Sequence, residues 1–146
     1  MEKFNKKPIH ISEGYALCDG MRIYDAVKLK ITVTPKVLSN RVLGDKTPNT
    51  RLGNTYDIAV EMTRRRSTNW TLNVLKKYLS NGITPEFTFV GVMNDKDSDF
   101  YDAYGETTVT VVGCVPTSPL DVLNLDADGE YFDEALTFAA KDIIIK

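Results

Sequence analysis

Apolar and polar residues alternate along several short segments of this chain, and a period of two predicts strands that bury one face. In residues 27–33, VKLKITV, valine, leucine and isoleucine alternate with lysine and threonine. The same alternation returns in residues 56–62, YDIAVEM, and similar runs follow at EFTFVGVM and ETTVTVVGCV. Asp19-Gly20 lies between two short runs, as is typical of a tight hairpin turn. The pattern predicts about seven strands joined by turn residues.

One segment, residues 68–81, has the period of an α-helix instead. Its apolar stripe consists of residues spaced three or four apart, namely Trp70, Val74, Leu75, Tyr78 and Leu79. Polar residues able to cap its start are Ser67, Thr68 and Asn69, and Gly82 is expected to end it in a left-handed conformation. One helix among short antiparallel strands predicts a mainly β fold, an antiparallel β-sandwich or barrel with one flanking α-helix.

Three segments fit neither period. Residues 35–55 contain two prolines, two glycines and scattered aliphatic residues, and are interpreted as a long loop, because a connection of this length is usually functional or disordered. Residues 1–12 are polar and are interpreted as a mobile N-terminal arm. The C-terminal DIIIK is too apolar for a free tail, so Ile143, Ile144 and Ile145 are expected to pair or pack.

The composition is that of an ordinary globular protein, and 146 residues correspond to one domain, residues 1–146. The net charge of −2 gives no general attraction to nucleic acid or to an anionic membrane. No apolar run approaches the ~20 residues that span a bilayer, and the N-terminus lacks a signal-peptide core, so no membrane anchoring is expected. Cys18 and Cys114 are interpreted as buried small hydrophobes in a reducing compartment.

Catalytic motifs are absent from the sequence, so no enzyme and no cofactor are predicted. His10 is the single histidine and lies in the polar N-terminal segment, which leaves no Ser-His-Asp or Cys-His pair to assemble. The glycines are isolated and form no phosphate-binding loop. Arg64, Arg65 and Arg66 precede the helix, whose positive dipole end disfavours them, so carboxylates are expected nearby, with a neighbouring chain as one source.

The acidic stretch NDKDSDFYDAYGE, residues 94–106, has the spacing of a calcium loop. Carboxylates at positions 1, 3, 5 and 12 of such a loop make weak metal-ligand candidates of Asp95, Asp97, Asp99 and Glu106. Position 6 is Phe100, where a calcium loop requires glycine, and strand-like segments flank the stretch where an EF-hand has helices. A solvated loop between two strands is therefore favoured, and no metal is predicted.

The order of several segments carries a resemblance to a known family. These segments are the helix from Trp70 to Gly82, Pro85-Glu86-Phe87, Asn94-Asp95-Lys96-Asp97, the strand from Thr107 to Val115, and Glu134-Ala135-Leu136-Thr137-Phe138. Together with an early hairpin at Leu17-Cys18-Asp19-Gly20 they resemble the tail tube proteins of contractile phage tails and tailocins. The group is typified by the tube of the PBSX defective prophage and of clostridial tailocins, and its fold is similar to that of type VI secretion Hcp rings.

The resemblance implies a virion structural protein that self-assembles, with six copies closing into a hexameric ring and rings stacking into a hollow tube. Such a tube conducts DNA through its lumen without specific binding, or opens a pore in the target envelope. Implied partners are further copies of the chain, the tail sheath protein, the tape-measure protein, and the baseplate and tail terminator proteins. Assembly in the bacterial host cytoplasm and a final location in the virion or tailocin tail tube are also implied.

The long loop is the first candidate for contacts between subunits, because its aliphatic residues would be buried only on assembly. The arginine run and the C-terminal isoleucines are further candidates. The full set of assembly candidates is therefore Val37, Leu38, Arg41, Val42, Leu43, Asp45, Lys46, Arg51 and Leu52 in the loop, Arg64, Arg65 and Arg66 before the helix, and Ile143, Ile144 and Ile145 at the C-terminus. Two alternatives remain open. One is an OB-like β-barrel module that binds nucleic acid or carbohydrate, although Phe87 and Phe89 have no interleaved basic residues. The other is a tail terminator or the tube of a non-contractile tail.

Overall fold

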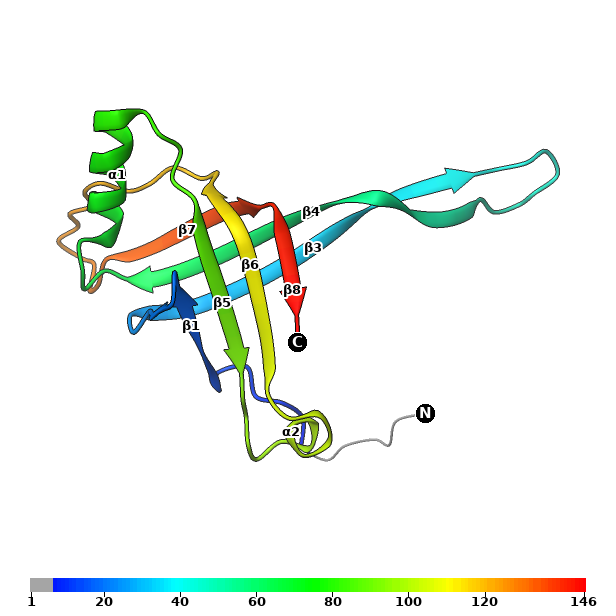
Figure 1. Cartoon of the computed structure of the whole chain (residues 1–146), viewed down its shortest axis with the longest axis horizontal. Helices are drawn as coiled ribbons and strands as arrows, with labels where there is room; N and C mark the ends of the chain where they lie inside the picture. Colours follow the sequence, from blue (N-terminus) through cyan, green and yellow to red (C-terminus); the bar gives the residue numbers. More distant parts are fainter. Residues whose placement is uncertain (1–6) are drawn as a thin grey trace.

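The computed structural model describes residues 7–146 and contains eight strands and two helices (Figure 1). In chain order the elements are β1 (Gly14–Cys18), β2 (Met21–Arg22), β3 (Ala26–Asn40), β4 (Asn49–Arg65), α1 (Trp70–Asn81), β5 (Phe87–Met93), α2 (Asp99–Tyr104), β6 (Thr107–Pro116), β7 (Asp133–Ala140) and β8 (Asp142–Ile145). None of the helices in residues 7–146 is long and apolar enough to cross a membrane.

All strand pairs are antiparallel, and they follow the order β2-β1-β5-β6-β7-β4-β3, with β8 paired to β6. The sheet folds over itself at β6, which pairs with β5 along most of its length. On its other edge β6 pairs with β8 from Val109 to Val112 and with β7 at Val115 and Pro116. In Figure 1, β5, β6 and β8 cross β3, β4 and β7 steeply. The predicted mainly antiparallel β fold is therefore confirmed.

The hydrophobic core lies between the two crossing parts of the sheet. Its buried members come from β4, β5, β6 and β7, namely Ile58, Val60, Met62, Phe89, Val111, Cys114, Leu136 and Phe138. From Ile58 to Met62, the alternation in β4 places every second side chain in the core, as the sequence predicts, whereas Tyr56 on the same face is exposed. Phe89 and Phe138 meet at 4.9 Å between ring centroids. Trp70 of α1 meets Phe87 at 5.0 Å, and this contact attaches the helix to the sheet.

Helix α1 confirms the one long helix predicted from the sequence. It begins at Trp70, and Asn69 occupies the N-cap position without a side-chain hydrogen bond. Gly82 ends the helix with φ of 66°, and its N–H donates to the carbonyl of Tyr78 at 2.8 Å. An L-residue with a Cβ pays a steric cost in this left-handed region, whereas glycine does not.

Replacing Gly82 with alanine is expected to lower the free energy of unfolding by about 1–2 kcal/mol, because alanine is strained at positive φ. Nothing lies within 4 Å of the added Cβ, so the loss comes from the backbone alone. Urea denaturation of the monomer measures it, and Gly82→Asn is the matched control, since asparagine tolerates this conformation better. An equal loss of free energy of unfolding in the alanine and asparagine variants would show that strain at positive φ is not the cause.

The prediction of a loop over residues 94–106 is wrong in part, because residues 99–104 form the second helix, α2. Ser98 is the N-cap, and its hydroxyl accepts the N–H of Tyr101 at 3.1 Å. Asp99 and Asp102 lie in the first turn, where the helix dipole favours negative charge. The helix has only six residues, too few to show the apolar period by which a helix is predicted from a sequence.

The described part of the N-terminal segment lies beside α2. The Lys7 N–H donates to the Asp99 carboxylate at 2.7 Å, and the His10 N–H donates to the Asp95 carboxylate at 3.0 Å. The Asn94 N–H in turn donates to the carbonyl of Glu13 at 3.2 Å. Residues 7–13 are thus hydrogen-bonded to the acidic stretch, while residues 1–6 of the predicted mobile arm lie outside the described residues.

Candidate assembly surfaces

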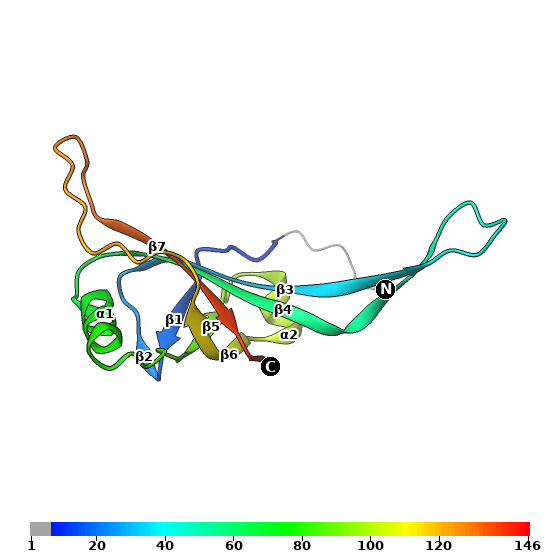
Figure 2. The same cartoon turned by 90° about the horizontal axis from the view of Figure 1, so that it is seen from above.

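Strands β3 and β4 continue past the body of the protein as a two-stranded hairpin (Figures 1 and 2). Pairing runs out to Asn40 and Asn49, with an irregularity between Pro35 and Val37. This corrects the prediction of a long loop over residues 35–55, since only residues 41–48 lie outside the strands. The two strands pair there only with each other, because β7 accompanies β4 only from Ile58 onward.

The hairpin exposes the aliphatic residues that the sequence singles out. All of residues 32–52 are exposed, and Leu43 at the tip is 102% exposed. Arg41 folds across the tip, where its Nε donates to the carbonyl of Asp45 at 3.2 Å and its Nη2 to that of Lys46 at 3.3 Å. The hairpin candidates therefore lie together on one projecting surface, made up of Val37, Leu38, Arg41, Val42, Leu43, Asp45, Lys46, Arg51 and Leu52.

Arg64 lies inside the subunit, with 2% of its surface exposed. Its Nη2 donates to the Asp25 carboxylate at 2.7 Å and to the Thr68 hydroxyl at 2.7 Å. Its Nε lies 3.7 Å from the Glu134 carboxylate, and its Nη1 donates to the Thr71 hydroxyl at 3.4 Å. The carboxylates expected near the arginines are thus present in the same chain, and Arg64 is not accessible to a neighbouring subunit.

The other two arginines connect β4 to β7 and to the segment before it. Arg65 pairs with Asp133 at 3.2 Å, and both side chains are about half exposed. Arg66 donates to the Glu134 carboxylate and to the main-chain carbonyls of Asp121 at 2.6 Å and Val122 at 3.0 Å. Arg66 therefore anchors the long connection between β6 and β7 to the end of β4.

The buried charges shift the titration of Asp25. Burial is the largest single influence and raises the pKa of this carboxyl. Hydrogen bonds from Arg64 and Ser67 and the charge of Arg64 outweigh burial, so the pKa lies below its ordinary value. A carboxyl whose pKa is lower in the folded state stabilises the fold above its unfolded pKa of about 3.9 and loses that contribution as pH falls through the folded value.

The free energy of unfolding is therefore expected to fall as the pH drops below about 4, and Asp25→Asn should make that fall shallower. Asparagine keeps the size of the side chain but has no carboxylate to protonate. Urea denaturation at a series of pH values between 7 and 2.5 measures the slope. Identical slopes in the two proteins would show that Asp25 does not contribute to the acid sensitivity.

The C-terminal isoleucines form β8, the edge strand beside β6. Ile143 pairs with Val111 in the ladder and packs against the core, while Ile144 and Ile145 are 44% and 70% exposed. The expectation that they pair or pack is confirmed. Only Ile144 and Ile145 remain accessible to a second copy.

Two acidic residues of the stretch 94–106, Asp95 and Asp99, accept hydrogen bonds from the main chain. Asp95 accepts the N–H groups of His10 and Asp97, at 3.0 and 3.2 Å, and Asp99 accepts that of Lys7. Glu106 is exposed at the end of the stretch. Across residues 7–146, no three histidine, cysteine or acidic side chains are grouped as metal ligands would be.

The two thiols lie inside the fold and are not bonded to each other. Burial, with added repulsion from Asp19 and Cys114, raises the pKa of Cys18 to about 12, and burial also raises the pKa of Cys114. Thiols with raised pKa values are poor nucleophiles. Their position agrees with the interpretation as small hydrophobes.

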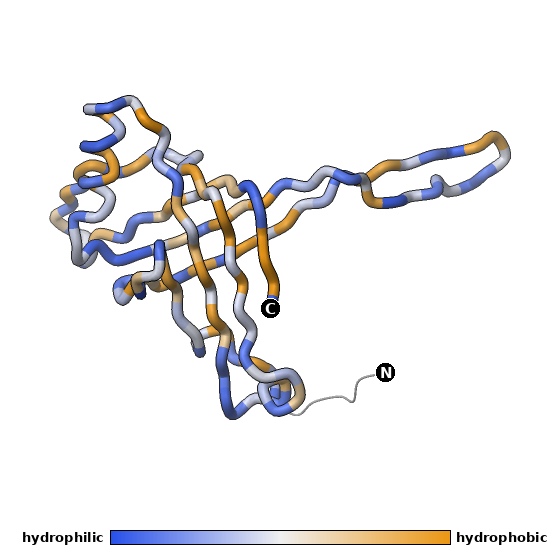
Figure 3. Tube along the Cα trace, viewed as in Figure 1, coloured by the Kyte–Doolittle hydropathy of each residue, from blue (hydrophilic) through white to orange (hydrophobic). Residues whose placement is uncertain are grey.

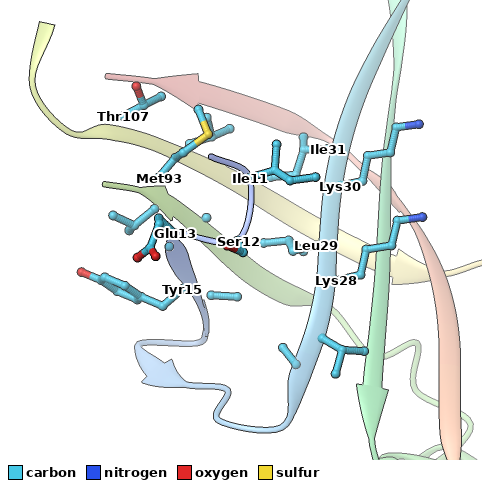
Figure 4. Close-up of a pocket in the computed structure, with 17 residues that line it drawn as sticks. Ile11, Ser12, Glu13, Tyr15, Lys28, Leu29, Lys30, Ile31, Met93 and Thr107 are labelled. Carbon is cyan, nitrogen blue, oxygen red and sulfur yellow. The ribbon is translucent and has the colours of Figure 1, made fainter. Parts of the chain in front are cut away.

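A groove of about 540 Å³ opens between β1, β3 and β5 (Figure 4). Its apolar wall includes Ile11, Leu29, Ile31 and Met93. Figure 4 shows Lys28 and Lys30 extending from the opposite side of β3, away from Leu29 and Ile31. The alternation predicted for VKLKITV is therefore observed. Among residues 7–146, Glu13 is the one acidic residue that lines the groove.

The aromatic strand gives no support to an OB-like binding module. Phe89 is fully buried and Phe87 packs among Trp70, Phe89 and Phe138. A module that binds single-stranded nucleic acid needs aromatic faces exposed for stacking. These rings instead form the core.

Some important residues carry no signal in the sequence. Asp25 and Glu134, the partners of the buried arginines, lie 39 and 70 positions from Arg64 in the chain, and nothing in their local sequence marks them as buried. Only a structure brings these residues together.

No family model matches the chain, and no curated protein matches its sequence. Solved structures, however, match nearly its whole length. One is a chain of the sheath–tube complex of an extracellular contractile injection system, PVC, in the extended state, with a TM-score of 0.71, 12% identity, and coverage of 97% of this chain and 93% of that chain.

Two further matches come from the ends of such assemblies. A chain of the PVC sheath/tube terminator in the extended state has a TM-score of 0.72 and 14% identity and covers 97% of this chain and 98% of that one. A chain of the tube-terminating cap of the anti-feeding prophage has a TM-score of 0.73 and 12% identity, with coverage of 100% and 95%. The chain therefore has the fold of subunits found in the sheath–tube, terminator and cap structures of contractile injection systems.

Proposed function

We propose that this chain is a structural subunit of a contractile tail or injection-system tube, in which six copies close into a ring and rings stack into a hollow tube. The observation that carries the proposal is the match of the fold over nearly the full length of both chains in three structures of such systems. The exposed aliphatic hairpin supports it, because projecting apolar residues indicate a surface that a partner covers.

The same proposal includes the partners. The tube contacts the sheath along its length, the baseplate and terminator at its ends, and a tape-measure protein within it, and its lumen passes DNA without specific binding or opens a pore in the target envelope. Assembly takes place in the bacterial host cytoplasm before the subunit becomes part of the virion or tailocin. The subunit acts by association and catalyses no reaction.

Electron microscopy of the concentrated protein tests this function. The purified chain is expected to form six-fold rings or hollow tubes in negative stain and to sediment as large particles. Analytical ultracentrifugation over a range of concentrations provides the second readout. A chain that stays monomeric at every concentration would contradict the proposal.

A tube terminator is the second candidate, because the terminator and the terminating cap match the fold as well as the sheath–tube chain does. A terminator closes into a ring but does not stack into long tubes. Micrographs that contain only single rings, at concentrations where a tube subunit would polymerise, would favour this candidate.

A further inference from the structure

Two exposed segments at opposite ends of the protein carry opposite charge. The first is the basic hairpin, residues 36–52, and the second is the acidic loop, residues 117–132. The basic hairpin projects at one end of the longest axis and the acidic loop lies at the other, and the two perpendicular views agree on this placement (Figures 1 and 2). They therefore do not contact each other within one subunit.

The basic hairpin combines positive charge with apolar surface. It contains four basic residues, Lys36, Arg41, Lys46 and Arg51, against one acid, Asp45, for a formal charge of +3. Its aliphatic side chains are 36–102% exposed. Figure 3 shows hydrophobic and hydrophilic residues interspersed along its length and a hydrophobic patch at its far end.

The acidic loop has the complementary composition. It contains four acids, Asp121, Asp126, Asp128 and Glu130, and no basic residue, for a formal charge of −4. Its exposed apolar side chains are Val122 at 59%, Leu123 at 72%, Leu125 at 84% and Tyr131 at 72%. Both segments therefore leave apolar side chains in water beside charges of a single prevailing sign.

The acidic loop is held in place although it contains no helix or strand. Arg66 binds the carbonyls of Asp121 and Val122, and the N–H of Thr117 donates to the carbonyl of Thr137 at 2.9 Å. The Ser118 hydroxyl accepts the N–H of Thr137 at 3.0 Å. These hydrogen bonds anchor the first part of the loop, residues 117–122. The loop therefore loses less conformational entropy on binding a partner than a free segment would.

We infer that the basic hairpin of one subunit docks on the acidic loop of a second copy of this chain, in a head-to-tail contact. Opposite charges steer the two surfaces together and reject wrong partners, and the aliphatic residues of both are buried in the contact. A contact between two different surfaces repeats from copy to copy, so it builds a closed ring or a filament. The inference rests on the proposed function, since it names the joint through which the subunits associate.

The groove between β1, β3 and β5 is a weaker match for the basic hairpin. Among its lining residues Glu13 is the one carboxylate, against four in the acidic loop. Charge complementarity therefore favours the acidic loop as the docking site.

A pair of charge-reversed variants tests the contact. The first variant is Lys36→Glu, Lys46→Glu and Arg51→Glu in the hairpin, and the second is Asp121→Lys, Asp128→Lys and Glu130→Lys in the loop. All six side chains are exposed, and none of them makes a side-chain hydrogen bond to another of residues 7–146. Each variant alone then presents like charges on both surfaces, and the concentration needed for assembly is expected to rise about 100-fold.

Mixing the two variants in equal amounts is expected to restore assembly, because each hairpin then meets a loop of opposite charge on the other variant. Sedimentation and negative-stain electron microscopy provide the readout, and circular dichroism of each variant confirms that it folds. Lys76→Glu with Lys77→Glu on α1 is the control for reversed charge outside the contact, and it should assemble like the unchanged chain.

The outcomes separate this inference from the proposed function. If the unchanged chain assembles but either triple variant also assembles alone, or the mixture does not, the head-to-tail contact is wrong while the tube subunit stands. If the unchanged chain never assembles, both are overturned. The contact is supported if the mixture assembles while neither triple variant assembles by itself. A loss of stability within each subunit would not be repaired by mixing, so it cannot account for that result.

Discussion

Replacing Glu134 with alanine is expected to lower the free energy of unfolding by about 3–5 kcal/mol, because two arginines lose a buried carboxylate at once. Glu134 is 1% exposed, and its carboxylate accepts from Arg66 and from the Thr71 hydroxyl and lies 3.7 Å from Nε of Arg64. Arg64 keeps Asp25, whereas Arg66 keeps two main-chain carbonyls and the ring of Phe132 but no carboxylate among the described residues. Urea denaturation below the concentration of assembly measures the loss, so that association does not mask it.

The neighbouring residue on the same strand is the matched control. Asp133 also pairs with an arginine, Arg65, but both side chains are about half exposed. Exposed ion pairs contribute about 0–1 kcal/mol, so Asp133→Ala should have little effect. If both variants lost a similar amount of free energy of unfolding, burial of the ion pair would not be the cause. Any substitution in strand β7 would then have the same effect.

Changing Val42, Leu43 and Leu52 together to serine is expected to abolish assembly while the monomer stays folded. Burying a valine or leucine side chain contributes about 1.5–3 kcal/mol, so three of them amount to roughly 4–9 kcal/mol per contact. Each 1.4 kcal/mol changes an equilibrium tenfold, so the concentration needed for assembly rises by about three orders of magnitude or more. Sedimentation velocity measures it directly.

The monomer provides the internal control for this variant. The three side chains are 56%, 102% and 64% exposed, so the free energy of unfolding should change by no more than about 0.5 kcal/mol. Leu79→Ser on α1, where the leucine is 77% exposed, tests an apolar side chain outside the hairpin. Normal assembly of the triple variant would show that the hairpin does not join the subunits.

The elements that bury one face could be predicted from the sequence. Strand β4 shows its core side chains through alternation, and α1 shows its stripe and its glycine stop. The outer half of the hairpin escaped prediction for the opposite reason. From residue 32 to residue 52 both faces are exposed, so no alternation between buried and exposed positions marks the strands.

The arginine run shows a second limit. Three adjacent arginines before a helix are typical of a solvated surface, yet Arg64 is buried beside two carboxylates from distant parts of the chain. Asp25 lies in the turn before β3, and Glu134 lies in β7. A buried charge is stable only with such partners. Local sequence contains the arginines but not the fold that brings their partners to them, so the interior role of Arg64 could not be predicted.

The continuity of β4 has a mechanical consequence. The strand is 17 residues long, about 56 Å at ~3.3 Å per residue, and runs unbroken from the exposed hairpin to the core residues Ile58, Val60 and Met62. A force applied near the tip therefore passes along one continuous main chain into the core, although the ladder of hydrogen bonds to β3 is interrupted between Pro35 and Val37. A load on the projecting ribbon therefore reaches the core strands through β4 itself, and the irregularity in the ladder marks the place where the ribbon bends.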